Sequence, residues 1–364
     1  MIKAVQIARY RGIRELVVPD FGRVNLIIGK NDVGKTALME ALRIAEDPEH
    51  AAHHLAQYQR DRLGRAAKVR IFDLDRFWKP VFFQLDAELG LSIAAIDNEG
   101  GSWNTLDIRL GAVPDEITST RYDLQGASGG TGEDADIVDR RAWSLDVLLS
   151  RGDKPASHQK VSATHAHFQM PPTPNPRGGS AWIPSSTGLG AVTVKYVSEL
   201  KQRGLDGELL DLLRDVDPRV AGIELLAPGG DVPELYVRTS ERVPLLPLSS
   251  MGEGFQRCLE LGAAAAAHGW PILFIDEIEN GLHHLVLEPL WRWLSTISRR
   301  RELQVFATTH SEECIHAATR AFGALGDDGL RVIRLDRGDG GTRAAVYDRA
   351  LAEAAERTDV EIRG

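Results

Sequence analysis

Residues 24–36 read VNLIIGKNDVGKT, an apolar run followed by a glycine-rich loop and the start of a helical segment. The loop, residues 29–36, fits the phosphate-loop pattern GxxxxGK[ST] at every fixed position. In such a loop, glycines let the backbone curl so that successive N–H groups point at phosphate oxygens, and the positive end of the following helix supports the same anion. The stretch therefore predicts a buried strand, a nucleotide-binding loop and a helix in that order.

The members of this loop are expected to have separate roles. Lys35 is expected to reach the β- and γ-phosphate oxygens of ATP, and the Thr36 hydroxyl is expected to bind Mg²⁺. The remaining cofactor-binding positions are Gly29, Asn31, Asp32, Val33 and Gly34. The alternative is a chance match inside an ordinary Gly-rich turn, but the strand before the loop and the helix after it argue against that.

A second apolar run, ILFI at 272–275, ends in the acids Asp276 and Glu277. Burying unpaired charge is costly, and a metal ion removes that cost. We expect Asp276 to hold Mg²⁺ and Glu277 to act as the general base that orients the attacking water. The alternative is a strand that simply ends at a solvated acidic turn.

A third apolar run, VFA at 305–307, ends in the polar cluster TTHS at 308–311. Parallel strands deliver their carboxyl ends to one edge of a sheet, so His310 is expected to meet Glu277 there. From that position His310 would hydrogen-bond the γ-phosphate. A lone histidine elsewhere in a chain more often has a structural role.

The segment 248–257, LSSMGEGFQR, places a serine, two close glycines and an acid before a strongly apolar helix. A loop that opens a helix presents N–H groups to which a phosphate held by a second molecule can bind. This interpretation assigns Ser250, Gly252 and Glu253 to the nucleotide. The alternative is a plain helix cap, in which Ser250 begins the helix and Glu253 closes a capping box.

Composition excludes several classes of protein. Lys and Arg total 43 against 52 Asp and Glu, a net charge of −9, which argues against a generally basic nucleic-acid-coating protein but leaves a local basic stripe open. The two cysteines, Cys258 and Cys314, support neither a disulfide framework nor a zinc site. The start of the chain has no apolar signal core, and the apolar stretch 261–275 is interrupted by Gly269 and Pro271. We expect a cytoplasmic protein without a membrane span.

The order of the expected elements predicts three regions, an N-terminal lobe at 1–110, an insertion at 111–185 and a C-terminal lobe at 186–364. Alternating strands and helices in the last region are typical of a parallel sheet with helices on its faces. The insertion is expected to be partly disordered, with a helix at 136–150. Expected strands are 2–8, 14–18, 24–28, 68–72, 80–87, 90–96, 104–110, 220–226, 234–238, 271–276, 303–308, 330–336 and 343–347. Expected helices are one after the phosphate loop, a pair within 190–215, and 253–268, 284–299 and 311–322.

The phosphate loop, S-x-G-E loop, hydrophobic-Asp-Glu strand and T-T-H-S strand follow one another in the order and spacing of ABC-type ATPase heads. Within that class the chain resembles the bacterial AAA-domain ATPases of the OLD and RloA kind. The resemblance is carried by the opening IARYRG at 7–12, by 248–257, by DEIENGLH at 276–283 and by 307–311. It implies an α/β fold, an ABC-ATPase head. Such a head has a mixed sheet with a parallel phosphate-loop core, an antiparallel N-terminal β lobe and a helical or insertion region.

The resemblance also implies a head-to-tail homodimer, or a higher even oligomer, that sandwiches two ATP molecules. Residues implied from one subunit are Lys35, Thr36, Asp276, Glu277 and His310, and those from the other are Ser250, Gly252 and Glu253. Two departures are visible, since the loop reads SSMGE rather than LSGGQ and the segment ENGLH lacks the usual D-loop aspartate. Gln84 is the candidate for the glutamine that contacts the metal, and Arg11 either reaches the nucleotide or caps a surface turn.

Two functions remain open from the sequence. The first is an ATP-driven switch or scaffold subunit of a prokaryotic anti-phage defence complex. OLD-like proteins pair this head with a Toprim nuclease, so the effector is expected on a separate chain here. The second is a DNA-repair or maintenance clamp resembling RecF or SMC proteins, which the lack of a long heptad arm disfavours. A transporter motor is disfavoured by the strand-rich start, and a GTPase by the absence of an N-K-x-D motif. Nucleic-acid binding is left open.

Overall fold

The structure is a computed structural model, and the residues that it describes are 1–64, 71, 73–97, 104–112, 143–151, 154–163, 168–170, 179–185, 190–230, 232–241, 244–267, 269, 271–338 and 340–357. Three predictions lie largely outside these residues. They are the strand at 68–72, the first half of the helix at 136–150, and the disorder within 111–185.

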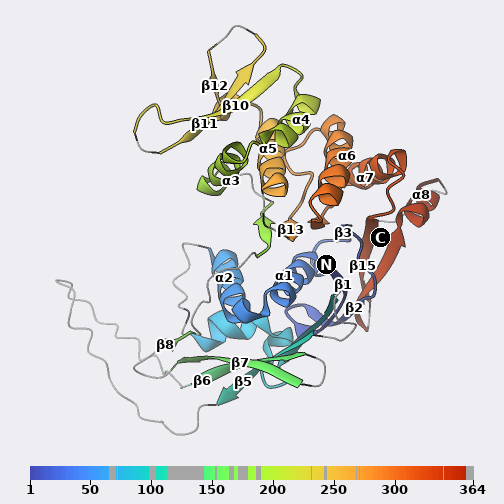
Figure 1. The fold of residues 1–364 in the computed structure, drawn as a ribbon. Helices are drawn as coiled ribbons and strands as arrows, with labels where there is room; N and C mark the ends of the chain where they lie inside the picture. Colours follow the sequence, from blue (N-terminus) through green and yellow to red (C-terminus); the bar gives the residue numbers. More distant parts are fainter. Residues whose placement is uncertain are drawn as a thin grey trace, which may run out of the picture.

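The described chain contains strands and helices of ordinary length (Figure 1). The strands are β1 (Ile2–Tyr10), β2 (Ile13–Val18), β3 (Val24–Ile28), β4 (Leu91–Asp97), β5 (Asn104–Ala112), β6 (Trp143–Arg151), β7 (Lys154–Ala163), β8 (Phe168–Gln169), β9 (Ala181–Ile183), β10 (Val220–Leu226), β11 (Glu234–Thr239), β12 (Leu246–Pro247), β13 (Ile272–Ile275), β14 (Gln304–Thr308), β15 (Leu330–Gly338) and β16 (Gly341–Asp348). The α-helices are α1 (Lys35–Glu46), α2 (Ala51–Leu63), α3 (Ala191–Gln202), α4 (Asp206–Val216), α5 (Glu253–Ala266), α6 (His284–Arg300), α7 (Glu312–Ala324) and α8 (Arg349–Arg357). Short helical turns are η1 (Pro48–His50), η2 (Leu74–Trp78), η3 (Lys79–Val81), η4 (Phe83–Leu85) and η5 (Leu248–Ser250).

A six-stranded mixed sheet forms the centre of the protein, in the order β16-β15-β3-β14-β13-β9. Neighbouring strands from β15 to β9 run parallel, and only β16 is antiparallel. The strand before the phosphate loop, β3, is buried along its whole length between β14 and β15. Because β3, β13 and β14 are parallel, the phosphate loop, the acidic pair and the polar cluster at 308–311 leave the sheet at the same edge. The predicted α/β fold with a parallel core is confirmed.

The two faces of this sheet are covered differently. Val24, Leu26 and Ile28 of β3 pack into a cluster with helices α3 to α7, whereas Ile27 packs into a second cluster with α1 and the antiparallel strands. This alternation is the period of two that a strand imposes on its side chains. In Figure 1, α3 to α7 lie on one side of β13 and β3, and α1, α2 and the antiparallel strands lie on the other.

The antiparallel sheet has seven strands, in the order β2-β1-β4-β5-β6-β7-β8. It confirms the strands predicted at 2–8, 14–18, 90–96 and 104–110. The strand predicted at 80–87 is wrong. This segment consists of the turns η3 and η4, with Gln84 at φ 54° and Leu85 at φ 64°, a conformation that ends an extended chain.

The second half of the helix predicted at 136–150 is also wrong, because residues from Trp143 onward form β6. Trp143, Leu145 and Val147 are buried while Asp146 and Leu148 are not, which is the alternation of a half-buried strand. β6 and β7 extend the antiparallel sheet, and β9 joins the central sheet beside β13. The three-region division stays a prediction, but described parts of 111–185 belong to both sheets.

The C-terminal elements were predicted well. The helical pair within 190–215 corresponds to α3 and α4, and the predicted strands and helices between 220 and 347 correspond to β10, β11, α5, β13, α6, β14, α7, β15 and β16. The helices α2 and α8 and the strands β6, β7, β8, β9 and β12 were not predicted. Among the described residues, no helix has both the length and the apolar composition needed to cross a membrane.

Candidate nucleotide-binding site

The phosphate loop depends on two glycines in the left-handed region. Gly29 has φ 139° and Gly34 has φ 105°. A Cβ atom at Gly29 would lie 2.5 Å from the carbonyl oxygen of Leu335, and one at Gly34 would lie 3.1 Å from Cγ1 of Ile13. Gly34 is also the N-cap of α1, with no side chain capping the helix, so the first N–H groups of α1 remain open to an anion.

Lys35 is buried inside the curled loop, with 8% of its surface exposed. Its Nζ donates hydrogen bonds to the carbonyl oxygens of Gly29 (2.7 Å) and Lys30 (2.9 Å). Burial lowers the pKa of Lys35 below its ordinary value, while the carboxylates of Asp276 and Glu277 act in the opposite direction. The ammonium group therefore faces both the loop carbonyls and the acidic pair.

The acidic pair after β13 is held by the last residue of β14. The Thr308 hydroxyl donates a hydrogen bond to Oδ1 of Asp276 (2.7 Å) and accepts one from the backbone N–H of Glu277 (2.8 Å). Glu277 has φ 46°, which is strained for a residue with a side chain. Such strain persists only where surrounding contacts enforce it, and it is enriched at functional sites.

His310 lies between Lys35 and Glu277. Its Nδ1 is 3.4 Å from Nζ of Lys35, and its Nε2 is 3.7 Å from Oε1 of Glu277. Its backbone N–H donates a hydrogen bond to Oε1 of Glu279 (2.8 Å). The structure thus brings together three side chains from three segments that are far apart in the sequence.

Three further residues support this arrangement and were given no role from the sequence. They are Thr308, Glu279 and Arg257. Arg257 of α5 is fully buried, and its guanidinium donates hydrogen bonds to the backbone oxygens of Pro184 (2.9 Å) and Asp276 (3.2 Å). An arginine on the largely apolar helix α5 was the available signal for Arg257. Glu279, the third acid of the string DEIE, offered a similar signal.

The loop before α5 lies open on the surface. Ser250, Gly252 and Glu253 are exposed, and no hydrogen bond or ion pair among the described residues joins them to the phosphate loop. The capping-box alternative is wrong. The N-cap is Gly252, no side chain caps the helix, and the Ser250 hydroxyl donates to the carbonyl oxygen of Pro247 (2.6 Å).

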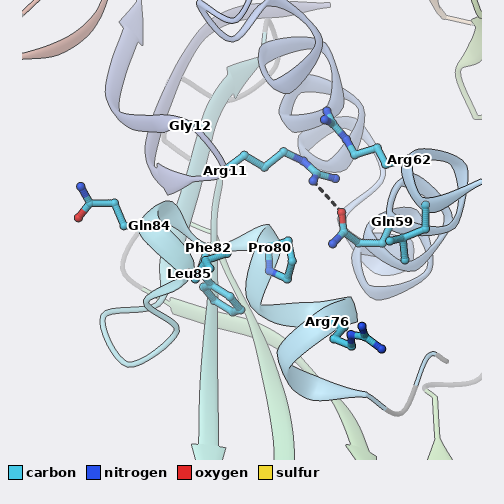
Figure 2. Close-up of a pocket in the computed structure, with 10 residues that line it drawn as sticks. Arg11, Gly12, Gln59, Arg62, Arg76, Pro80, Phe82, Gln84 and Leu85 are labelled. Atoms are coloured by element: carbon cyan, nitrogen blue, oxygen red, sulfur yellow. Dashed lines mark hydrogen bonds between the residues drawn. The ribbon is translucent and has the colours of Figure 1, made fainter. Parts of the chain in front are cut away.

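Arg11 does not cap a surface turn. Its side chain is 8% exposed and reaches helices α1 and α2, where Nε lies 2.6 Å from Oε2 of Glu40 and the guanidinium donates to Oε1 of Gln59 at 2.7 Å. Gln84 lines the same pocket as Arg11 (Figure 2). Among the described residues no hydrogen bond joins Gln84 to Thr36 or Asp276. Contact of Arg11 with the nucleotide, and of Gln84 with the metal, stay predictions.

The oxygen donors at the site fit Mg²⁺ carried by a nucleotide. The described residues contain no group of three or more His, Cys, Asp or Glu side chains arranged to hold a metal ion by themselves. Mg²⁺ is often bound through one or two protein oxygens, with phosphates and water completing its shell. Asp276 and the hydroxyl of Thr36, in the first turn of α1, are donors of this kind.

Comparisons with known proteins fit this geometry. Residues 201–315 match the family model described as "AAA domain, putative AbiEii toxin, Type IV TA system". A Helicobacter pylori protein named ATP/GTP phosphatase is 23% identical over 344 residues, which cover 86% of each chain. An uncharacterized protein of Methanocaldococcus jannaschii is 28% identical over 102 residues, 27% of this chain and 43% of that protein.

Two solved structures of SMC heads are similar in outline. The SMC head bound to the C-winged helix domain of ScpA covers 98% of this chain and 99% of its own, with a TM-score of 0.49 and 12% identity. The SMC head domain from Thermotoga maritima covers 95% of this chain and 98% of its own, with a TM-score of 0.43 and 11% identity. The family match and the Helicobacter relative support nucleotide hydrolysis by an AAA-type ATPase domain.

Proposed function

We propose that the protein is a Mg²⁺-dependent ATPase whose nucleotide phosphates lie in the loop 29–36 at the start of α1. The observation that carries this proposal is the meeting of Lys35, Glu277 and His310 at one edge of the central sheet. In the bound state, phosphate oxygens replace the carbonyls of Gly29 and Lys30 as partners of Lys35.

Each residue at this edge has a distinct task in hydrolysis. Glu277 accepts a proton from the attacking water, and its strained backbone directs the carboxylate toward the site. Asp276 and Thr36 would hold Mg²⁺, which would neutralise charge on the transferred phosphoryl group. Thr308 fixes Asp276 and Glu277 relative to each other, and His310 donates a hydrogen bond to the γ-phosphate.

The direct test of the base is Glu277→Gln, which keeps the size of the side chain but cannot accept a proton. We expect ATP hydrolysis to fall about 100-fold or more, because general base catalysis contributes on that order, while ATP binding is retained. Phosphate release and nucleotide titration measure the two quantities. Glu313→Gln, an exposed acid in the first turn of α7, is the matched control. Hydrolysis at the unaltered rate in Glu277→Gln would remove Glu277 from the base role.

We further propose that the site is completed by a second copy of the chain. Support comes from the exposed loop with Ser250, Gly252 and Glu253, whose polar groups are not used in the nucleotide site of their own chain. In a head-to-tail homodimer, this loop presents the N-terminus of α5 to the triphosphate held by the other copy.

Mixing two inactive variants tests this composite site. Lys35→Ala cannot bind phosphate through its phosphate loop but has an intact loop before α5. Ser250→Arg has an intact phosphate loop but a disrupted loop before α5. If the loop acts across the dimer, a mixture regains one intact site per mixed dimer and a substantial part of the ATPase activity. If the loop acts within its own chain, the mixture stays inactive. Ser249→Arg, on an exposed neighbouring residue, controls for bulk at this surface.

The biological role that we propose is a switch or scaffold subunit of an anti-phage defence complex whose effector is a separate chain. The family description that matches 201–315 names a toxin of a toxin–antitoxin system, and this supports a role in microbial conflict. Copurification from the native host identifies the effector, and Lys35→Ala should abolish protection against phage. Protection without a functional phosphate loop would contradict the role. The clamp resembling RecF or SMC proteins stays an alternative, and it predicts stimulation of ATP hydrolysis by DNA.

A further inference from the structure

A pocket of about 370 Å³ lies beside the turn between β1 and β2. Its walls come from that turn, from the end of α2, and from the segment 76–85, and no residue of the phosphate loop or the acidic pair lines it. Figure 2 shows Arg11 extending from the turn toward Gln59, with Arg62 nearby. We call this the arginine pocket.

Positive charge is in excess at the arginine pocket. Arg11, Arg62 and Arg76 line it, and the acid paired with the first two is the single carboxylate of Glu40, at 2.6 Å and 3.0 Å. Within the described chain, Arg76 has no ion pair with an acid. A partly enclosed site with uncompensated guanidinium groups favours an anion, and phosphate matches the fork of arginine donors.

A buried donor of Arg11 is also without a partner. Nη2 of Arg11 is shielded from solvent and has no hydrogen-bond partner among the described residues. The rest of the guanidinium is fixed by Glu40 and Gln59, so this nitrogen cannot turn to another acceptor without breaking those bonds. Buried donors in proteins are nearly always hydrogen-bonded, so this nitrogen can donate to an oxygen atom from outside the chain, either that of a ligand or that of a water molecule.

The backbone around the pocket is strained at three positions. Arg11 (φ 52°), Gln84 (φ 54°) and Leu85 (φ 64°) all lie in the left-handed region, although none is a glycine. Conformations of this kind persist at binding sites, where they direct side chains. The segment that the sequence predicted as a strand is thus bent around the pocket.

An apolar wall faces the arginines. Phe82 is almost fully buried and Pro80 lies beside it, while Leu85 leaves 57% of its surface exposed at the rim. An inorganic anion alone would not cover this wall. We propose that the arginine pocket binds a small organic phosphate, with the phosphate held by Arg11, Arg62 and Arg76 and the organic part packed on Pro80 and Leu85.

Phenyl phosphate is a suitable probe, because it joins one phosphate to one apolar ring. Binding is measured by calorimetry on the full chain carrying Lys35→Ala, so that the phosphate loop does not compete. In that background we expect Arg76→Gln and Arg62→Gln each to weaken binding about tenfold. The matched control is Arg60→Gln, an exposed arginine on the same helix that does not line the pocket. If Arg62→Gln disturbs the fold through loss of its pair with Glu40, the exposed Arg76 still provides the test.

Two more probes separate the parts of the ligand. Phenol, which lacks the phosphate, and inorganic phosphate, which lacks the ring, should each bind at least tenfold more weakly than phenyl phosphate. Equal binding of either one, unchanged binding in both arginine variants, or no binding in the Lys35→Ala background would overturn the proposal. Since these readouts do not involve ATP hydrolysis, they fail or succeed independently of the proposed ATPase.

Discussion

Two glycine-containing loops in this protein precede helices, and they differ in how closely the rest of the chain packs against them. The phosphate loop is enclosed, with Gly29 against Leu335 and Gly34 against Ile13. The loop before α5 is open, and a Cβ atom at Gly252 would have no neighbour within 4 Å. Both loops leave the N-terminus of their helix without a side-chain cap.

The difference agrees with the proposal that one chain supplies only half of a nucleotide site. The enclosed loop already has its lysine, its acids and its histidine in place, and each is held by hydrogen bonds or close contacts within the chain. The open loop has a helix N-terminus and exposed polar groups but no counterpart among the described residues. We infer that its counterpart belongs to another copy.

The largest expected effect is on the enclosed loop. Lys35→Ala removes a buried ammonium group that would make charge-assisted hydrogen bonds with phosphate, and we expect ATP affinity to fall about 100-fold or more. Lys30→Ala, which removes an exposed lysine of the same loop, should leave affinity within about threefold. Calorimetric titration with a slowly hydrolysed ATP analogue measures both. Equal ATP affinities in the two variants would contradict the expectation that the buried Lys35, and not the exposed Lys30, binds the phosphates.

A paired substitution compares the two loops directly in stability. Gly29→Ala places a Cβ atom against a backbone oxygen at a positive φ, so we expect a loss of about 2 kcal/mol in the free energy of unfolding. Gly252→Ala has φ −58° and open space, so the change should stay within about 0.5 kcal/mol. Urea denaturation measures the two values. A destabilised Gly252→Ala variant would show that the open loop is packed after all.

The smallest expected effect concerns Glu46, the last residue of α1, which is partly buried by the rest of the chain. Burial, aided by repulsion from Asp47, raises the pKa of Glu46 to about 7. The folded pKa lies above the ordinary value, so the stabilising contribution of the protonated form is present at low pH and is lost as pH rises through 7. Glu46→Gln should therefore raise the free energy of unfolding by about 1 kcal/mol at pH 8, after allowance for partial exposure, and by less at pH 5.

Urea denaturation at the two pH values measures this difference. Glu49→Gln, at an exposed position, should show no comparable gain. An equal gain from Glu46→Gln at pH 5 and pH 8 would mean that the Glu46 carboxyl is not the group that titrates.

The segments that carry the candidate site could be predicted from the sequence because each has the same simple form. Residues 24–28, 272–275 and 304–308 are short apolar runs that end in glycine, acidic or hydroxyl residues, and their parallel pairing brings those ends together. The helices α5, α6 and α7 could be predicted for a related reason, since each carries a long apolar stripe.

Other features depend on contacts that no local pattern encodes. The run LDVLL within 143–151 suits either a helix or a strand, and pairing with β5 decides for the strand. The bend at Gln84 and Leu85 needs a left-handed backbone that neither residue type signals. The bridging role of the Thr308 hydroxyl follows from its hydrogen bonds to Asp276 and Glu277, which lie beside Thr308 in space but 32 and 31 residues before it in the sequence.

The position of β3 in the central sheet has a consequence for synthesis on the ribosome. β3 begins at Val24 and pairs with β14 and β15, which begin at Gln304 and Leu330, so its hydrogen-bonding partners are translated 280 and 306 residues later. A nascent chain that ends before β14 contains the complete phosphate loop but lacks the two strands that flank β3. Pairing over such a separation forms late because loop closure must precede it. On the proposed function, the ATP site is therefore complete only when most of the polypeptide has emerged, and the first nucleotide binds to a nearly finished chain.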